Sequence, residues 1–194
     1  MTWTVRRALQ GDAGELARIN VAAWQHAYRG LVSDALLDRM LPESRLKGWQ
    51  RWLAMPDPDG VFLAEDEQGG VGAYCGVCEA RDPEDVHEDL STGELLALYG
   101  DPERKGTGAG RAAHQAGLDH LAAQGFRYAV LWVFQDDAAS RSFYEHHGWR
   151  HDGAVREYDV DGQRLMTVRY GRFLRAPGRR SRPPSVPRSR PAFG

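Results

Sequence analysis

Residues 94–134 read ELLALYGDPERKGTGAGRAAHQAGLDHLAAQGFRYAVLWVF, and this stretch decides the fold. Residues 94–99 predict a strand, and the alanine-rich residues 108–124 predict a helix. Residues 128–134 form a nearly unbroken apolar run, which is typical of a strand covered on both faces in a parallel pair. The stretch therefore predicts a strand–helix–strand unit with a right-handed crossover.

The flanking sequence predicts further strands and helices around this unit. Alternating apolar residues indicate strands, whereas apolar residues at helical spacing, bounded by caps and prolines, indicate helices. Strands are expected at residues 5–8, 61–65, 71–79, 154–160 and 163–170. Helices are expected after a capping Asp12 and at residues 33–40, 44–53 and 138–147, with Pro42 as a break. The fold class is therefore α/β with a mixed sheet.

The last two strands flank Asp161-Gly162, a strong signal for a hairpin turn. Alternation along these strands predicts one shared face. The residues assigned to that face are Tyr158, Val160, Met166, Val168 and Tyr170.

The net charge of −2 hides two unequal parts. Five of the 25 basic residues and none of the 27 acidic ones fall in residues 176–194, so residues 1–175 carry −7. We expect 1–175 to be one domain and the Pro- and Arg-rich 176–194 to be a disordered tail. The acidic body disfavours nucleic acid as a partner. Without an apolar leader or spanning segment, a cytoplasmic protein with no membrane contact is expected.

The loop Lys105-Gly106-Thr107-Gly108-Ala109-Gly110-Arg111 is expected to bind an anion. Glycines leave the backbone N–H groups unobstructed, and the following helix directs its positive end into the loop. Phosphate is the natural ligand, although a turn that needs glycine only for its geometry is the alternative. A P-loop would end in Gly-Lys-Ser/Thr, and a dinucleotide fold would space its glycines G-x-G-x-x-G, so ATP and NAD are disfavoured.

Two segments resemble the GNAT superfamily of acetyl-CoA-dependent N-acetyltransferases. The first is LYGDPERKGTGAG at 98–110, similar to the family's pyrophosphate motif; Lys105 stands at its usual Arg or Gln, and Gly100 at an aliphatic position. The second is DAASRSFYEHHGW at 137–149, similar to Asn-x-x-Ala-x-x-Phe-Tyr-Glu-x-x-Gly-Phe, with Asp137 for Asn and Ser140 for Ala. The resemblance covers about residues 3–171.

The resemblance implies a mostly antiparallel central sheet with one parallel strand pair that splays around the coenzyme, and helices on both faces. Acetyl-CoA is the implied co-substrate, and its pantetheine arm would replace the missing ladder bonds between the splayed strands. The implied coenzyme-binding residues are Leu98, Tyr99, Gly100, Lys105, Gly106, Thr107, Gly108, Ala109, Gly110, Arg111, Asp137, Ser140 and Phe143.

Amide formation from a thioester needs a neutral amine and a leaving thiolate that gains a proton. Glu94 is the candidate for a base acting through water, with an ordinary surface carboxylate as the alternative. Tyr144 is the candidate acid, because the family's tyrosine lies near the coenzyme sulfur and phenols and thiols have similar acidities. The other interpretation makes Phe143 and Tyr144 core aromatics.

Other residues give weaker indications. His26 and Tyr28 are substrate-side candidates by position in the family. Cys75 and Cys78 form a single C-x-x-C inside a strand, where their side chains face opposite ways, so no metal site is expected. The acceptor is expected to be a small amine or a peptide N-terminus, and a homodimer is left open. A catalytically weak coenzyme A-binding or regulatory module on the same fold is the alternative function.

Overall fold

The computed structural model describes residues 2–175, so the tail expected at 176–194 lies outside the described residues. Seven strands form one sheet in the order β1-β2-β3-β4-β5-β7-β6. The strands are β1 (Thr4–Arg7), β2 (Gly60–Glu65), β3 (Val71–Glu79), β4 (Thr92–Gly100), β5 (Tyr128–Phe134), β6 (Arg150–Val160) and β7 (Gln163–Phe173). The helices are η1 (Gln10–Asp12), α1 (Ala13–Ala27), α2 (Asp34–Arg39), α3 (Pro42–Leu53), η2 (Pro83–Asp85), η3 (Pro102–Arg104), α4 (Ala109–Ala123) and α5 (Ala138–His146).

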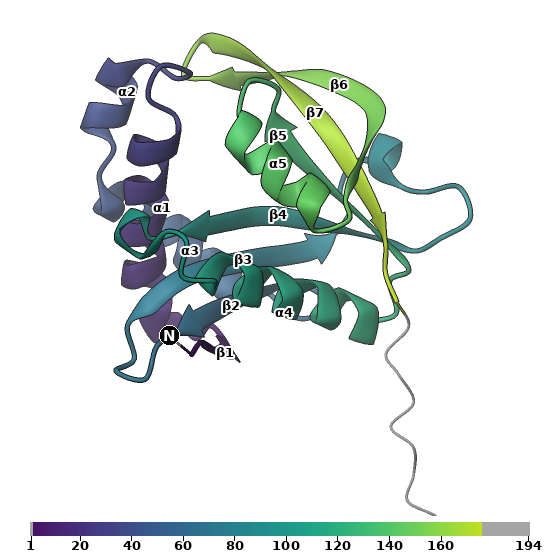
Figure 1. The fold of residues 1–194 in the computed structure, drawn as a ribbon, viewed down its shortest axis with the longest axis horizontal. Helices are drawn as coiled ribbons and strands as arrows, with labels where there is room; N and C mark the ends of the chain where they lie inside the picture. The colour runs from purple at the N-terminus through teal and green to yellow at the C-terminus, as the bar shows by residue number, and fades with distance from the viewer. Residues whose placement is uncertain (1, 176–194) are drawn as a thin grey trace, which may run out of the picture.

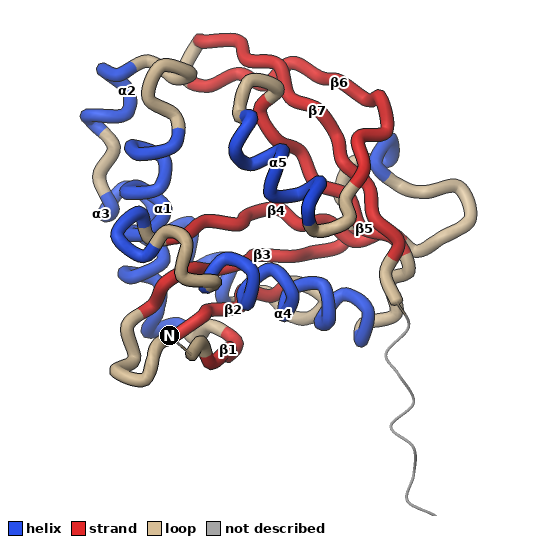
Figure 2. The backbone as a smooth tube through the Cα atoms, viewed as in Figure 1, coloured by secondary structure: helices blue, strands red, loops and turns tan. Residues whose placement is uncertain are grey.

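The sheet is antiparallel except for one parallel pair, β4 and β5, which α4 connects as the sequence predicts (Figure 1). That parallel ladder is short, because it joins residues 92–94 to residues 128–130 only. Beyond it, β4 continues along β3 and β5 continues along β7, so the two strands diverge. Figure 2 shows the divergence in the middle of the sheet. The mixed sheet and its splayed pair are thereby confirmed.

Helices cover both faces of the sheet. On one face, α4 and α5 pack on a core that includes Leu121, Leu131 and Trp149. On the other, α1 and α3 pack on β2 and β3 through residues such as Leu16 and Trp49. Each fully buried leucine contributes about 1.5–3 kcal/mol by leaving water. The splayed strands thus lie between two packed layers.

Side chains of β5 point alternately to the two faces of the sheet, and each set packs in a different core cluster. Ala129, Leu131 and Val133 belong to the core beneath α4 and α5. Phe134 belongs to a third cluster with Tyr28 and residues of α2 on the opposite face. Trp132 lies on Phe134's side of the strand, because side chains two residues apart share a face.

The two cysteines are free and buried, and they lie on opposite faces of β3 as expected. A Cβ on Gly117 of α4 would come within 2.6 Å of the Cys75 sulfur, so glycine lets this helix lie close to the strand. Burial raises the pKa of Cys78 to about 12, which makes it unreactive. Within residues 2–175, no cluster of His, Cys, Asp or Glu is arranged to hold a metal ion.

Two local predictions differ from the structure. Pro42 is the first residue of α3, a position where its missing N–H is not needed. Asp12 precedes α1, but its carboxylate accepts hydrogen bonds from Arg6 and the Leu9 N–H instead of capping the helix.

In the part of the chain that the structure describes, no helix combines the length and hydrophobicity needed to cross a membrane.

The predicted face of the last hairpin is wrong. Asp161 and Gly162 have φ values of 55° and 84° and form a two-residue turn that pairs Val160 with Gln163. Tyr158 therefore pairs with Leu165, whereas Met166 and Val168 pair with Glu157 and Val155. Since paired residues share a face, Tyr158 and Val160 lie on the face opposite to Met166 and Val168.

Candidate active site

The loop between β4 and α4 presents a row of unpaired backbone N–H groups. Gly106 and Gly108 have φ values of 79° and 93°, a left-handed conformation that residues with a Cβ rarely adopt. Among the described residues, no carbonyl or side chain accepts from the N–H groups of residues 106 and 108–111. A Cβ on Gly110 would meet nothing within 4 Å, so this side of the loop is open. The geometry fits an anion held by backbone donors.

Side chains hold this loop in place and add positive charge at its rim. The Trp3 indole N–H donates to the Thr107 carbonyl at 2.9 Å, and the Thr107 hydroxyl donates to the Arg104 carbonyl at 2.7 Å. Arg104 in turn pairs with Asp66 in the β2–β3 turn. Lys105 and Arg111 are exposed beside the N–H groups. The loop is thus fixed from behind, while its donors and cations face outward.

The second feature is the opening between β4 and β5. A bulge at Leu96 interrupts the pairing of β4 with β3, because Leu95 pairs with Val77 and Ala97 with Gly76. Residues 95–100 have no ladder partner on the β5 side, and Leu96 is 42% exposed. The backbone N–H and C=O groups on this edge are available to a ligand with amides of its own.

Helix α5 borders the same opening. Its N-terminal Asp137 accepts a hydrogen bond from the Ser140 N–H at 3.0 Å, which confirms it as a cap, and its second carboxylate oxygen is buried without a partner. Tyr144 packs against Trp149 and Tyr170 and is 8% exposed. Burial, followed by the nearby Tyr99, raises the pKa of the Tyr144 hydroxyl far above its ordinary value of about 10.

Glu94 lies on the other face of the sheet. It ends the parallel ladder, opposite Val130, and it is 7% exposed. Burial raises its pKa, Asp85 raises it further, and Arg81 and Arg156 oppose the shift. The Glu94 carboxylate is therefore a buried group and not an ordinary surface carboxylate. The other acid at the end of β4, Asp101, pairs with Arg18 at 2.7 Å, which lowers its pKa and leaves it a poor base.

Aromatic side chains cover the face of the sheet opposite α4 and α5, near the end of β4. Trp24 and Tyr28 of the first helix pack edge-on with ring centroids 4.9 Å apart, and Tyr28 packs on Phe134 at 5.0 Å. The Trp24 N–H donates to the Tyr99 hydroxyl at 3.0 Å. His26 is exposed; because Trp24 and Tyr28 are four residues apart and His26 lies between them, it faces away from the aromatic group.

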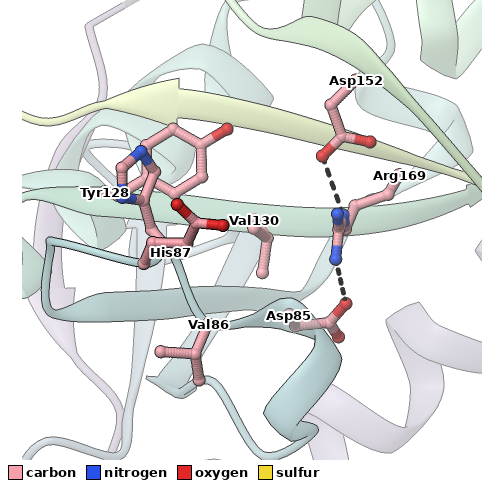
Figure 3. Close-up of a pocket in the computed structure, with 8 residues that line it drawn as sticks. Asp85, Val86, His87, Tyr128, Val130, Asp152 and Arg169 are labelled. Carbon is pink, nitrogen blue, oxygen red and sulfur yellow. Dashed lines mark hydrogen bonds and ion pairs between the residues drawn. The ribbon is translucent and has the colours of Figure 1, made fainter.

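A hollow of about 300 Å³ lies farther along the same face, near the beginnings of β4 and β5. Asp85, His87, Tyr128 and Val130 line it, and Arg169 lies between Asp85 and Asp152 (Figure 3). Asp85 is 3% exposed, and it accepts from Arg169 at 2.9 Å and from the Trp132 N–H at 2.9 Å. The 80–91 loop is thereby tied to β5 and β7.

The structure brings most of the sequence-predicted residues together. The glycine loop, Leu98, Asp137 and Tyr144 border the opening from the α4–α5 side, whereas Glu94, Tyr28 and the Tyr99 side chain lie on the other face. Phe143 stacks on His147 and lies beside His114, so it belongs to helix packing. Gly100 pairs with Ala73, where its Cβ would meet only ordinary contacts.

Sequence reasoning missed Trp132, Asp85 and Arg156. The first was concealed in the apolar run of β5, although alternation from Phe134 would have placed it on the same face. The other two come from a loop and an edge strand far apart in the sequence, and no local pattern predicts that they meet.

An open seam within a mixed α/β sheet, with an anion cradle at one end, suits a coenzyme that carries a pyrophosphate and an amide-bearing arm. The model of the acetyltransferase (GNAT) family matches residues 21–149, more than half of the chain. The chain belongs to this family.

The relatives agree with this assignment. The chain is 28% identical over 168 residues to YuaI, an N-acetyltransferase of Bacillus subtilis, covering 87% of this chain and 91% of YuaI. It is 34% identical over 159 residues to a mycothiol acetyltransferase of Streptomyces avermitilis, covering 81% of this chain but only 44% of that longer protein.

Solved structures show the same fold at low sequence identity. An acetyltransferase from Salmonella typhimurium with acetyl-CoA has a TM-score of 0.65 at 20% identity, covering 90% of this chain and 95% of that one. An N-acetyltransferase from Thermoplasma acidophilum with coenzyme A has a TM-score of 0.62 at 18% identity, covering 87% and 98%.

Proposed function

We propose that the protein transfers an acetyl group from acetyl-CoA to a primary amine by direct attack of the amine nitrogen. The proposal rests on two adjacent parts of the structure whose backbone groups lack hydrogen-bond partners. The unpaired N–H groups of residues 106 and 108–111 follow directly from the strand edge at residues 95–100 that lacks a partner on the β5 side. A ligand with a pyrophosphate and an amide-bearing arm satisfies both at once.

Glu94 accepts the proton of the attacking amine, through water, from the face of the sheet opposite Tyr144. Its buried position raises its pKa, and a raised pKa makes a carboxylate a stronger base near neutral pH. As the nitrogen bonds to the acetyl carbon, the carbon–sulfur bond breaks; the amine loses one proton to Glu94 through water, and the sulfur leaves as a thiolate that takes a proton from solvent. A backbone N–H of residues 96–100, at the bulged strand, holds the carbonyl oxygen.

Tyr144 stabilises the departing sulfur mainly as a hydrogen-bond donor. The notion of equal acidities does not suit this site, because burial raises the pKa of the phenol well above that of a thiol, about 8.5. The hydroxyl is therefore always protonated and available to donate. Complete transfer to the thiolate would leave a buried phenolate, which the same burial disfavours.

The proposed acceptor is a small amine or a peptide N-terminus, and the proposed compartment is the cytoplasm. Residues 1–175 are proposed as the catalytic unit, because they contain every residue proposed here for coenzyme binding and for catalysis. A chain that ends at residue 175 should therefore keep the kinetic constants of the full chain.

The test is a screen of amines and free-N-terminal peptides with acetyl-CoA and a thiol-release readout. We expect at least one acceptor to release thiol and to yield an equal amount of acetylated amine. A control without acceptor measures hydrolysis. Coenzyme binding without transfer to any amine would contradict the proposal and favour the catalytically weak coenzyme-binding module.

A further inference from the structure

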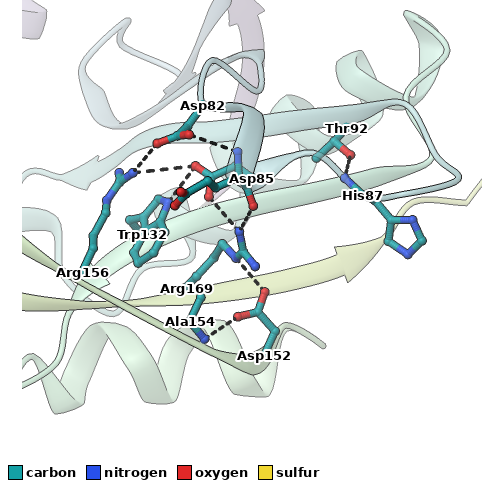
Figure 4. Close-up of polar contacts among 10 residues, drawn as sticks. Asp82, Asp85, His87, Thr92, Trp132, Asp152, Ala154, Arg156 and Arg169 are labelled. Atoms are coloured by element: carbon teal, nitrogen blue, oxygen red, sulfur yellow. Dashed lines mark hydrogen bonds and ion pairs between the residues drawn. The ribbon is translucent and has the colours of Figure 1, made fainter.

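Two guanidinium groups lie in the charged cluster around Asp85, and their surroundings differ (Figure 4). The Arg169 side chain is 20% exposed, and short hydrogen bonds occupy three of its five N–H donors. They reach the Glu84 carbonyl at 2.6 Å, Asp152 at 2.8 Å and Asp85 at 2.9 Å. This arginine is a structural tie between the 80–91 loop and the β6–β7 hairpin.

Arg156 is held in a different way. Its guanidinium lies over the Trp132 ring, 3.9 Å from the centroid, and its side chain is 38% exposed. It forms two long ion pairs through one guanidinium nitrogen, at 3.5 Å with Asp82 and 3.8 Å with Asp85. A guanidinium has five N–H donors, and the only hydrogen bond found for Arg156 among the described residues is the long one to Asp82. Most of its donors are therefore not used.

The stacking surface beneath Arg156 is itself fixed. The Trp132 N–H donates to the buried Asp85 carboxylate at 2.9 Å, and Arg169 holds that carboxylate from another side. A guanidinium stacked on a fixed aromatic ring keeps its plane and its donor edge in one orientation. Such preorganisation suits two-point binding of a carboxylate, the partner whose geometry matches the guanidinium fork.

Arg156 also lies on the correct face of the sheet for an acceptor. On β6 it pairs with Thr167, which pairs with Phe134 of β5, so it shares the face of Phe134 and Trp132. Glu94 ends the β4–β5 ladder on this face and is electrostatically coupled to Arg156. A proton-accepting carboxylate and a cation with unused donors therefore lie on one surface.

We propose that Arg156 binds the carboxylate of the acceptor, so that the enzyme acetylates amines that carry a nearby carboxylate, the amino acid class. The inference rests on the proposed acetyl transfer and narrows it, because a peptide N-terminus lacks that carboxylate. Glu94 and Arg156 together complement a zwitterion: one receives the ammonium proton, and the other pairs with the anion.

The test uses the full chain and a panel of amino acids, each paired with its carboxamide, which keeps the shape but removes the charge. We expect the wild type to favour the acids over the amides by about 10- to 100-fold in kcat/KM, chiefly through KM, as for a charge-assisted pair. Arg156→Gln should reduce that ratio by about tenfold or more, and Arg156→Lys should be intermediate. Arg164→Gln removes an exposed arginine from the other face of the same hairpin and should keep the ratio.

Thermal stabilisation of the coenzyme A-bound protein by the same pairs provides a readout that needs no turnover. The inference is supported if the acids raise the Tm of the wild type more than that of Arg156→Gln, while the amides raise the two Tm values equally. Equal use and equal binding of acids and amides by the wild type would overturn it. A variant Arg156→Gln whose kcat/KM falls equally for the acids and the amides would overturn it as well. Transfer to no amine at all, with selective binding of acids retained, would contradict the proposed function but not the Arg156 site.

Discussion

Glu94 and Tyr144 lie on opposite faces of the sheet, on either side of the opening between β4 and β5. Glu94 pairs with Val130 at the last rung of the parallel ladder, and Tyr144 packs in the core beneath α4 and α5. An acyl donor that threads the opening would expose its carbonyl to one residue and its sulfur to the other. The proposed proton acceptor and the proposed hydrogen-bond donor thus lie on separate faces, so the two roles can be tested separately.

Replacement of Tyr144 by Phe should lower kcat by about 10- to 100-fold and leave coenzyme affinity nearly unchanged. The hydroxyl is needed only when negative charge develops on the sulfur, whereas the ring keeps its packing. Steady-state kinetics and calorimetric titration with acetyl-CoA measure the two quantities. Unchanged turnover would remove Tyr144 from the mechanism.

Replacement of Gly108 by Trp should abolish coenzyme binding, because residues with a Cβ rarely adopt a φ of 93°, so the backbone that presents the N–H donors would have to shift. Gly125→Trp is the matched control. Gly125 has φ of 100° just beyond the C-terminal end of α4, at the opposite end of that helix from the loop, and carries the same backbone strain. Binding that survives in the Gly108 variant, measured by calorimetry, would refute the anion cradle.

The variant Glu94→Gln should be slower than the wild type and should lose the acidic limb of the pH–rate profile. The pKa of Glu94 is raised by burial and by Asp85, so wild-type turnover should fall as the pH drops through that raised value. Glu67→Gln, in an exposed turn, is the control. An identical acidic limb in Glu94→Gln and the wild type would assign the titration to another group.

The same variant should be more stable than the wild type at neutral pH. A carboxylate with a raised folded pKa destabilises the fold once it ionises, and this cost is absent below the unfolded pKa of about 4.3. The gain in Tm should therefore shrink as the pH falls toward 4. Equal stability at all pH values would show that ionised Glu94 carries no penalty.

A buried histidine should make the fold sensitive to acid. His114 accepts from the Trp149 N–H at 2.9 Å, and burial, aided by Arg172 and His147, lowers its pKa to about 3. The unfolded chain binds this proton below about pH 6.5, so stability is full above that value and declines as the pH falls toward 3.

Denaturant unfolding measures this effect. The wild type should lose about 2 kcal/mol between roughly pH 7.5 and pH 4.5 relative to His114→Gln, whose amide oxygen can still accept from Trp149. His26→Gln changes an exposed histidine and should follow the wild type. Parallel pH curves for the wild type and His114→Gln would disprove the assignment.

Local sequence patterns were sufficient to predict the strand–helix–strand unit of residues 94–134. The glycine loop, the helix after it and the apolar run of β5 are continuous in sequence, so their order predicts the parallel pair. The hairpin face was misassigned because alternation identifies faces within a strand but not which residue of one strand pairs with which of the next. The two-residue turn at 161–162 contains that information, since it pairs Val160 with Gln163.

The charged surface could not be predicted in the same way. Trp132, Asp85 and Arg156 meet only because the 80–91 loop folds over β5 and the β6 edge strand lies alongside β7. Each contact depends on the register of a different strand pair. The raised pKa values of Tyr144 and Glu94 likewise follow from burial in three dimensions.

Hydrogen exchange with and without acetyl-CoA tests whether the coenzyme binds the unpaired N–H groups of the glycine loop and the strand edge. We expect slower exchange at residues 106–111 and at residues 95–100 when acetyl-CoA is added, with little change in the β2–β3 ladder. If calorimetry shows binding but both segments exchange as fast with acetyl-CoA as without it, the coenzyme does not bind these groups.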